Sequence, residues 1–177
     1  MKIKAMGAAL VLVTGFSGVA SANNGTIEFN GEIVANTCTV ANADGAGTIQ
    51  VTLPTLSSAS FAAEGDRAGQ TYVPIELSGC TPASGTVGVR FTGNAAQVDM
   101  DEGLFKNTGT ATNVAVGVYS QSDDTQVKPG QEGGAFATID TSTGDATVQL
   151  NSYYVSTDTT VGAGTVTATG GFELEYK

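Results

Sequence analysis

The sequence contains no histidine and no tryptophan. Without histidine, the chain cannot form a His-based catalytic triad, a histidine proton shuttle or the commonest ligand set for zinc. Ser57, Ser58 and Ser152 have no candidate base near them in the sequence. Without tryptophan, the chain also lacks the side chain best suited to stack on a sugar ring, which weakens a lectin function. We therefore expect a protein that is not an enzyme and that needs no cofactor.

Basic residues are scarce, with 7 Lys and Arg against 17 Asp and Glu. Those that follow the N-terminal leader are scattered along the chain, at Arg67, Arg90, Lys106, Lys128 and Lys177. An acidic chain without a basic cluster is poorly suited to bind a phosphate backbone, so we exclude nucleic acid as a partner. The acidic stretches 99–102 and 123–124 lack the spacing of a calcium-binding loop, and we expect no metal site there.

A long apolar run occurs only near the start of the chain. Lys2 and Lys4 precede the apolar residues 8–16, and the small residues 20–22 follow. This order is typical of a secretory signal peptide, which we predict spans residues 1–22. Its removal from the 177-residue chain leaves 155 residues, and the loss of two lysines lowers the net charge from −10 to −12. No other apolar run approaches the roughly 20 residues of a membrane helix, so we predict one exported domain without membrane insertion.

The chain has only two cysteines, Cys38 and Cys80. An even pair in an exported protein predicts one disulfide bond rather than a redox or metal site. Closing a loop of this size stabilises a fold by about 4 kcal/mol when the effect is ascribed to chain entropy. Aromatic residues make up only 7% of the chain, so we expect a thin core and a need for another source of stability.

Residues 166–177 alternate between apolar and polar side chains. One face carries the small or apolar residues Val166, Ala168, Gly170, Phe172, Leu174 and Tyr176. A period of two predicts a half-buried strand. Because no later segment follows Lys177 to cover this strand, we expect its second edge to be filled by an earlier segment of the same sheet or by another chain.

Similar alternation occurs in several earlier stretches. In residues 25–35, Gly31 is a plausible break at which the first half of the segment could leave the domain. Further strands are predicted over residues 48–53, 70–80, 86–92, 111–119 and 147–155. Pro74 lacks an amide hydrogen, which predicts that its nitrogen faces an edge or a bulge. About seven strands separated by turn residues predict an all-β, immunoglobulin-like sandwich.

Several of these stretches occur in the same order in one family of exported proteins. They are residues 25–34, residues 75–80, residues 111–114, Tyr153 and Tyr154, and residues 171–177, with Gly164 fourteenth from the C-terminus and Tyr176 penultimate. On these residues, the mature chain resembles the major pilins of the chaperone–usher pathway of Gram-negative bacteria, in the type 1 fimbrial group. The resemblance implies an incomplete immunoglobulin-like β-sandwich whose last strand is supplied by another molecule.

The resemblance also implies a role for each end of the chain. Gly164 and the alternating face from Val166 to Tyr176 would line a hydrophobic groove and would first bind a periplasmic chaperone. Residues 23–31 would be a donor strand, with Gly25, Ile27 and Phe29 entering the groove of the next subunit at the outer-membrane usher. Residues 32–177 would then form the pilin domain. Only fifteen residues separate the predicted cleavage site from Cys38, and the first two are asparagines, so the outermost part of the groove would be weakly filled.

The implied function is structural. The subunit would be exported through the periplasm and would polymerise by donor-strand exchange, forming the shaft of an extracellular fimbria that supports adhesion. Two alternatives remain open: a minor or tip pilin that binds a host receptor, and a self-complemented secreted β-sandwich. Adhesins of the first kind usually carry an additional lectin domain, for which 155 residues leave no room.

Overall fold

A computed structural model describes residues 27–131 and 134–177 of the chain. The contacts divide the chain into two units, residues 1–33 and residues 34–177. The predicted signal peptide and Gly25 lie outside the described residues. Residues 27–33 of the first unit form no strand, and the side chains of Ile27, Phe29 and Ile33 are 78%, 90% and 101% exposed. The apolar residues of this segment are therefore open to solvent.

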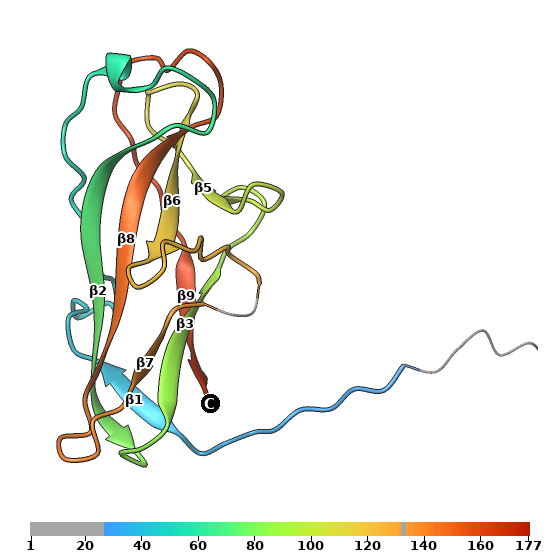
Figure 1. Ribbon diagram of the computed structural model, residues 1–177, viewed down its shortest axis with the longest axis vertical. Coiled ribbons are helices and arrows are strands. Elements are labelled where there is room, and N and C mark those ends of the chain that lie inside the picture. The colour runs from blue at the N-terminus through green and yellow to red at the C-terminus, as the bar shows by residue number, and fades with distance from the viewer. Residues whose placement is uncertain (1–26, 132–133) are drawn as a thin grey trace, which may run out of the picture. The chain divides into compact units, whose positions relative to one another are not determined.

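The second unit is all-β, as the alternating sequence predicts (Figure 1). Its strands are β1 (Thr37–Val40), β2 (Arg67–Thr81), β3 (Thr86–Thr92), β4 (Val98–Asp99), β5 (Leu104–Lys106), β6 (Val114–Ser120), β7 (Phe136–Thr138), β8 (Ala146–Ser156) and β9 (Gly171–Tyr176). A single turn of 3-10 helix, η1 (Ser58–Ser60), lies between β1 and β2. In the described part of the chain, no helix is long and apolar enough to cross a membrane.

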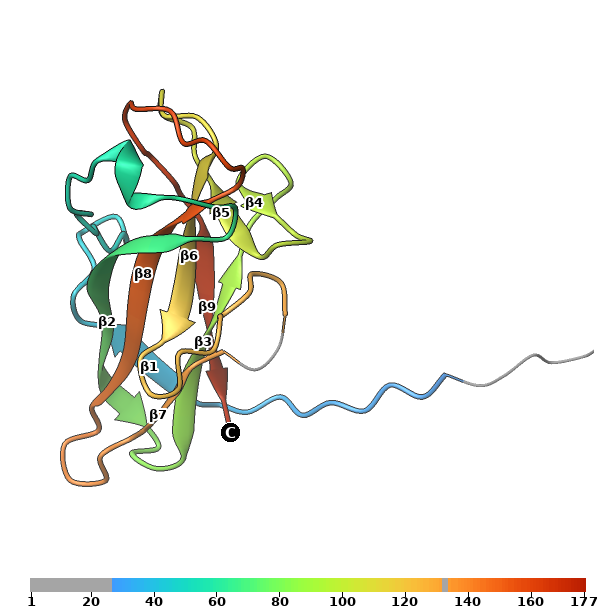
Figure 2. The ribbon, with the colours of Figure 1, turned by 45° about the horizontal axis from the view of Figure 1, so that its top comes forward.

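The strands form two sheets (Figure 2). The larger sheet has the order β1-β2-β8-β6-β5-β4, and the smaller sheet has the order β7-β3-β9. Every strand pair in both sheets is antiparallel. Side chains of both sheets meet in one core, which confirms the predicted β-sandwich.

The core comes from the inward-facing residues of the long central strands. Ile75 of β2 and Leu150 of β8 are 2% and 0% exposed, and Val87 and Val89 of β3 are fully buried. In β2, buried Val73, Ile75 and Leu77 alternate with more exposed residues, because successive side chains of a strand point to opposite faces of its sheet. Each buried side chain of this size contributes about 1.5–3 kcal/mol to the hydrophobic stabilisation.

Pro74 lies in β2 where the neighbouring strand has already ended. β1 pairs with β2 only as far as Val40, opposite Leu77. Beyond that point the Asn42 side chain replaces the strand: its Nδ2 donates to the Pro74 carbonyl over 2.8 Å, and its Oδ1 accepts from the Glu76 amide over 3.1 Å. The residue without an amide hydrogen therefore faces an edge, as the sequence predicts.

Some expected strands differ from those observed. Residues 48–53 form no strand, although Ile49 and Leu53 are half-buried against the core. The last strand begins at Gly171 rather than at residue 166. Before it, the carbonyls of Thr165 and Thr167 accept hydrogen bonds from the amides of Ala111 and Thr108, which belong to a loop and not to a strand. Alternation gives the buried face of a segment but not the partner that would make it a strand.

The predicted disulfide bond is present between Cys38 and Cys80. It joins β1 to the end of β2, next to the backbone pairing of Thr37 with Thr81. Cys80 is buried and Cys38 is half-buried, so the bond lies between the core and an edge of the larger sheet.

Candidate functional site

One edge of β9 has no neighbouring strand within the described residues, because β9 ends the smaller sheet. Thr86 of β3 and Lys177 exchange two backbone hydrogen bonds, of 3.0 and 2.9 Å. In an antiparallel pair, residues that exchange bonds alternate with residues whose backbone groups point away from the partner. The observed register therefore turns the backbone amides and carbonyls of Phe172, Leu174 and Tyr176 toward the open edge.

The same three residues also face the core with their side chains. Phe172, Leu174 and Tyr176 are half-buried and pack against the core cluster. The intervening residues point outward, and Glu173 forms an ion pair with Arg90 of β3 over 2.7 Å. The unpaired edge of β9 thus offers hydrogen-bonding groups and apolar surface at the same residues.

A second unpaired edge belongs to β1, which ends the larger sheet. The Cys38 amide donates a 3.0 Å hydrogen bond to the hydroxyl of Tyr176. Adjacent strands lie about 4.8 Å apart and bond backbone to backbone, whereas here a tyrosine side chain reaches from one strand to the other. The two free edges therefore face each other at this level without pairing.

We call the half-buried apolar side chains along these two edges the apolar edge. Its residues are Cys38, Val40, Ile49, Leu53, Val166, Ala168, Phe172, Leu174 and Tyr176, all packed against the core cluster. Five of them were predicted from the alternation of residues 166–177. The other four come from segments far away in the sequence. The alternation of residues 49–53 indicated Ile49 and Leu53, whereas no pattern indicated that Cys38 and Val40 lie at this edge.

The remaining predicted site residues have other positions. Gly170 lies directly under the ring of Phe105, which occupies the place of a side chain at that position. Gly164 is exposed and lies against the backbone of Thr110 and Ala111. Ile27 and Phe29 belong to the other unit, and Gly25 lies outside the described residues.

Gly164 permits a close approach of two backbone segments, which leads to a test. A Cβ atom at this position would lie 2.6 Å from the Thr110 carbonyl carbon, closer than atoms can pack. We expect Gly164→Ala to lower the free energy of unfolding by about 1–3 kcal/mol, the usual cost of overpacking. Gly45→Ala is the matched control, because nothing lies within 4 Å of its added Cβ. Urea unfolding of the purified chaperone-bound subunit measures both variants, and equal midpoints would contradict this role.

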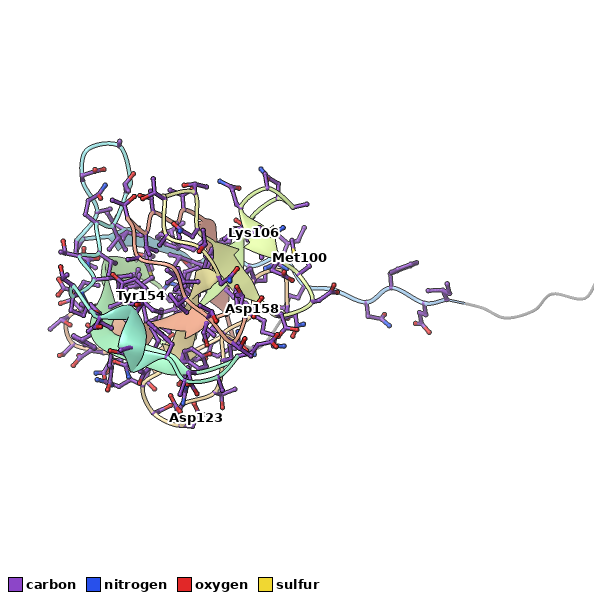
Figure 3. All side chains as sticks on the ribbon, turned by 90° about the horizontal axis from the view of Figure 1, so that it is seen from above. Met100, Lys106, Asp123, Tyr154 and Asp158 are labelled. Atoms are coloured by element: carbon purple, nitrogen blue, oxygen red, sulfur yellow. A yellow bond between two sulfur atoms is a disulfide. The ribbon has the colours of Figure 1, made fainter. Side chains whose placement is uncertain are left out.

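Three other surface features of the domain contain no residue of the apolar edge. Two cavities of about 290 and 230 Å³ lie elsewhere, one beside Lys106 and Asn107 and one beside Ser122 and Phe136. The exposed Met100 lies across the domain from Tyr154 in the view from above (Figure 3). The apolar edge is therefore distinct from these cavities and from isolated exposed side chains.

Arg67 forms a closed cluster on the outer face of the larger sheet. Its guanidinium lies 4.4 Å from the ring centre of Tyr119 and 5.0 Å from that of Tyr153. It also binds both carboxylate oxygens of Asp124, at 3.1 and 2.6 Å. These hydrogen bonds from Arg67 lower the pKa of Asp124, and burial raises the pKa of Tyr119. The positive charge of Arg67 is therefore balanced by the carboxylate of Asp124.

Within residues 27–131 and 134–177, no three His, Cys, Asp or Glu side chains are grouped so that they could hold a metal ion. The acidic stretch that begins at Asp99 is instead a turn, in which Asp99 Oδ1 accepts from the amides of Asp101 and Glu102 at 3.1 and 3.2 Å. This carboxylate oxygen therefore accepts hydrogen bonds from the backbone of its own turn.

Comparison with known proteins identifies the family of this chain. The sequence pattern of the family described as "Fimbrial protein" matches residues 27–177, which include both the exposed N-terminal segment and the apolar edge. The chain belongs to the fimbrial protein family. As a fimbrial subunit it is a structural protein of surface fimbriae built by the chaperone–usher route in Gram-negative bacteria, and not an enzyme.

Relatives of this fimbrial subunit match it over nearly their whole length. It is 34% identical to the type-1 fimbrial protein subunit of Serratia marcescens, with 96% of each chain covered. It is 31% identical to the laminin-binding fimbrial subunit ElfA of Escherichia coli O157:H7, with 99% of each chain covered. Its fold is similar to the crystal structure of a Burkholderia pseudomallei antigen and type I fimbria protein, with a TM-score of 0.52, 26% identity, and coverage of 80% of this chain and 95% of the other.

Proposed function

We propose that this fimbrial subunit is the repeating shaft subunit of a pilus, and that the N-terminal segment of each copy fills the apolar edge of the next. One observation carries the proposal: the same chain has an unpaired edge on β9 and a separate segment with exposed, alternating apolar residues. The segment can pair with the unpaired backbone of β9, and the apolar edge can bury the exposed apolar side chains of the segment.

The two partners match in their periodicity. On β9, the residues that face the core are also those whose backbone groups face the open edge. A strand added there forms hydrogen-bonded pairs at its inward-facing residues, because directly opposite residues of a sheet point to the same face. The positions of Ile27, Phe29 and Ile33 differ by two and four, so in an extended strand all three side chains point to the same face and enter the core together.

The expected energy favours exchange of one donor strand for another without an external energy source. Each of these apolar side chains is worth about 1.5–3 kcal/mol when it becomes fully buried. Each backbone hydrogen bond to β9 adds about 0.5–1.5 kcal/mol. We propose residues 23–31 as the core of the donor, extended to Ile33, since the division of the chain into two units falls after this residue.

Donor and acceptor in one chain give an open-ended assembly. The interface joins two different surfaces of identical molecules, so each added copy leaves one donor and one acceptor unused. A subunit that ends the fibre needs only one of the two features. The presence of both therefore supports a subunit within the fibre over one at its tip.

The assembly partners follow from the exposed edge. Before polymerisation, we propose that a periplasmic chaperone lends a strand to β9 and binds the terminal carboxylate, and that an outer-membrane usher replaces this strand with the next subunit's donor. The Lys177 carbonyl oxygen lies 3.0 Å from the Thr86 amide, which fixes the chain end beside the edge to be covered. Residues 1–22 are proposed as the signal peptide that directs export.

Receptor binding is a second candidate function, favoured by one relative that is described as laminin-binding and that matches this chain along its full length. If this function is present, it is a property of the assembled surface, because the donor and the apolar edge are used in the fibre. A laminin-coated surface should then retain assembled fibres but not the chaperone-bound subunit.

The shaft function is tested by co-expressing the full chain with its own chaperone and usher and running the surface protein on a denaturing gel. Without boiling, we expect a ladder of multiples of the subunit mass, which collapses to one band after boiling. A stable monomer that forms in the absence of the chaperone would instead support a self-complemented protein and contradict the proposal.

A further inference from the structure

We propose that Asn30 and Gly31 form a spontaneous deamidation site in the unassembled subunit, and that one product of the reaction, isoaspartate, excludes old subunits from the fibre. The chemical step depends only on the exposed segment that contains the two residues. Its effect on assembly rests on the proposed shaft function. The site therefore limits the time during which a waiting subunit can still be assembled.

The residue after Asn30 favours this reaction. Asn-Gly occurs twice in the sequence, at Asn24 and at Asn30, and the pair at Asn30 lies among the described residues. In deamidation, the backbone nitrogen of the following residue attacks the side-chain amide of asparagine. Glycine has no Cβ to obstruct this attack and allows the widest choice of backbone angles. Nothing lies within 4 Å of a Cβ built at Gly31, so no neighbouring atom restricts the approach.

The structure leaves both reacting groups accessible. Asn30 and Gly31 are exposed and belong to no strand. Among the hydrogen bonds between residues of the described ranges 27–131 and 134–177, none involves residues 27–36. No bond of this kind therefore holds the side-chain amide of Asn30 or the backbone amide of Gly31 away from the other.

Two asparagines of the folded domain show the contrast. Asn107 Oδ1 accepts from the amides of Gly109 and Thr167 at 2.8 and 2.9 Å. Asn113 Nδ2 donates to the Thr160 carbonyl over 2.7 Å. Each of the two is also followed by a β-branched residue, threonine or valine, whose side chain crowds the backbone nitrogen. We therefore expect deamidation at Asn30 to be much faster than at these two sites.

The reaction requires only water. The Gly31 nitrogen bonds to Cγ of Asn30, the bond from Cγ to Nδ2 breaks, and the proton of the Gly31 amide leaves with Nδ2 as ammonia. Water then opens the resulting succinimide at one of its two carbonyl carbons. Opening at Cγ gives aspartate. Opening at the backbone carbonyl gives isoaspartate, in which the main chain continues through Cβ and Cγ.

The two products affect the segment differently. Aspartate keeps the main chain unchanged and places its charge on the face opposite to Phe29. Isoaspartate adds a methylene to the main chain between Phe29 and Gly31. Ile27 and Phe29 before this methylene and Ile33 after it then no longer share the period of two on which a paired strand depends. We expect a subunit with isoaspartate to pair over only part of the segment and to stay outside the fibre.

Assembly should slow the reaction. A residue that is held in a strand reacts only when the strand opens locally. An opening that costs about 1.4 kcal/mol lowers the rate about tenfold. Subunits in the fibre should therefore keep Asn30, whereas chaperone-bound subunits that wait should lose it.

A protease specific for glutamate reads the site directly. Cleavage after Glu28 and Glu32 releases peptide 29–32, in which Asn30 is the only asparagine. The mature subunit bound to its chaperone and assembled fibres are incubated in parallel at neutral pH and then digested. Chromatography separates the asparagine, aspartate and isoaspartate forms of this peptide. We expect deamidation in the chaperone-bound subunit to be at least about tenfold faster than in the fibre.

Gly31→Ala is the variant that tests the mechanism. It adds a Cβ in open space, so it removes no contact of the segment, but the methyl group obstructs the attack on Asn30. We expect slower deamidation of this variant in the chaperone-bound state and nearly normal assembly. In a second measurement, incubated subunits of the natural sequence are offered to the usher. The fibres should contain asparagine and aspartate at position 30, and the unassembled remainder should be enriched in isoaspartate.

The opposite results separate this inference from the shaft function. If position 30 stays unmodified in the chaperone-bound subunit, or if Gly31→Ala reacts as fast as the natural sequence, the site is wrong and the shaft function stands. If isoaspartate enters fibres as readily as asparagine, the effect on assembly is wrong. Equal deamidation in subunit and fibre contradicts the shaft function itself, because the segment would then remain unpaired in the fibre.

Discussion

Phe29→Asp is expected to abolish incorporation of the subunit into fibres and to leave its domain folded. Phe29 is 90% exposed and belongs to the unit before residue 34, so the change removes no contact of the domain core. In the proposed fibre, the same position would face the apolar edge of the next copy. The variant loses about 1.5–3 kcal/mol of apolar burial and must also desolvate a carboxylate. The amount of polymer on an unboiled gel should fall at least about a hundredfold, which corresponds to roughly 2.7 kcal/mol.

Asn30→Asp is the matched control for this variant. It introduces the same side chain one residue later, on the face of the donor that points to solvent. We expect nearly normal polymer from it. Co-purification with the chaperone shows whether each domain is folded. If Phe29→Asp polymerises as well as Asn30→Asp, residues 27–33 are not the donor and the shaft function loses its physical basis.

The fold was predictable where one segment carries a complete pattern. The alternation around Ile75, Val89 and Leu150 predicts β2, β3 and β8 because each strand has one face in the core and pairs along its length. The short strands β1, β4, β5 and β7 were not predicted. They contain four, two, three and three residues, too few for a period of two to stand out from loop sequence.

The candidate site was predictable on one side only. Phe172, Leu174 and Tyr176 follow one another along a single strand, so their common face is visible in the sequence. The opposite side of the apolar edge contains Val40, Ile49 and Leu53. A turn separates Val40 from the other two, and in this turn the Asp44 amide donates a hydrogen bond to the Thr48 carbonyl. No local pattern states which distant segment meets β9, because that choice depends on the packing of both sheets.

The predicted strand at residues 166–170 has the buried face of a strand but no partner strand. Val166 and Ala168 are half-buried as alternation requires, but the backbone there bonds to Thr108 and Asn107 instead of a strand. The Asn107 side chain accepts from the Thr167 amide over 2.9 Å, and so replaces a ladder bond. A strand added on the open side supplies the missing partner along this stretch. We therefore expect β9 to lengthen toward Val166 in the fibre.

Removing the disulfide bond with Cys38→Ala and Cys80→Ala is expected to lower the free energy of unfolding by about 4 kcal/mol. The bond closes a loop with a sequence separation of 42, so its loss frees a large part of the unfolded chain. It also frees β1, whose four residues otherwise depend on backbone pairing with β2 and on the Tyr176 contact. Because β1 forms one side of the apolar edge, the variant should bind a donor strand poorly as well as unfold early.

Urea unfolding of the purified chaperone-bound subunit measures the first effect, and assembly with chaperone and usher measures the second. Thr39→Ala with Ser78→Ala is the matched control, because this pair also joins β1 to β2 but only through backbone register. We expect the control to change stability by less than about 1 kcal/mol and to assemble normally, as is usual for partly exposed sites. If the cysteine variant matches the control in both measurements, β1 is held by its backbone pairing alone, and the disulfide bond is not what keeps this side of the apolar edge in place for the incoming strand.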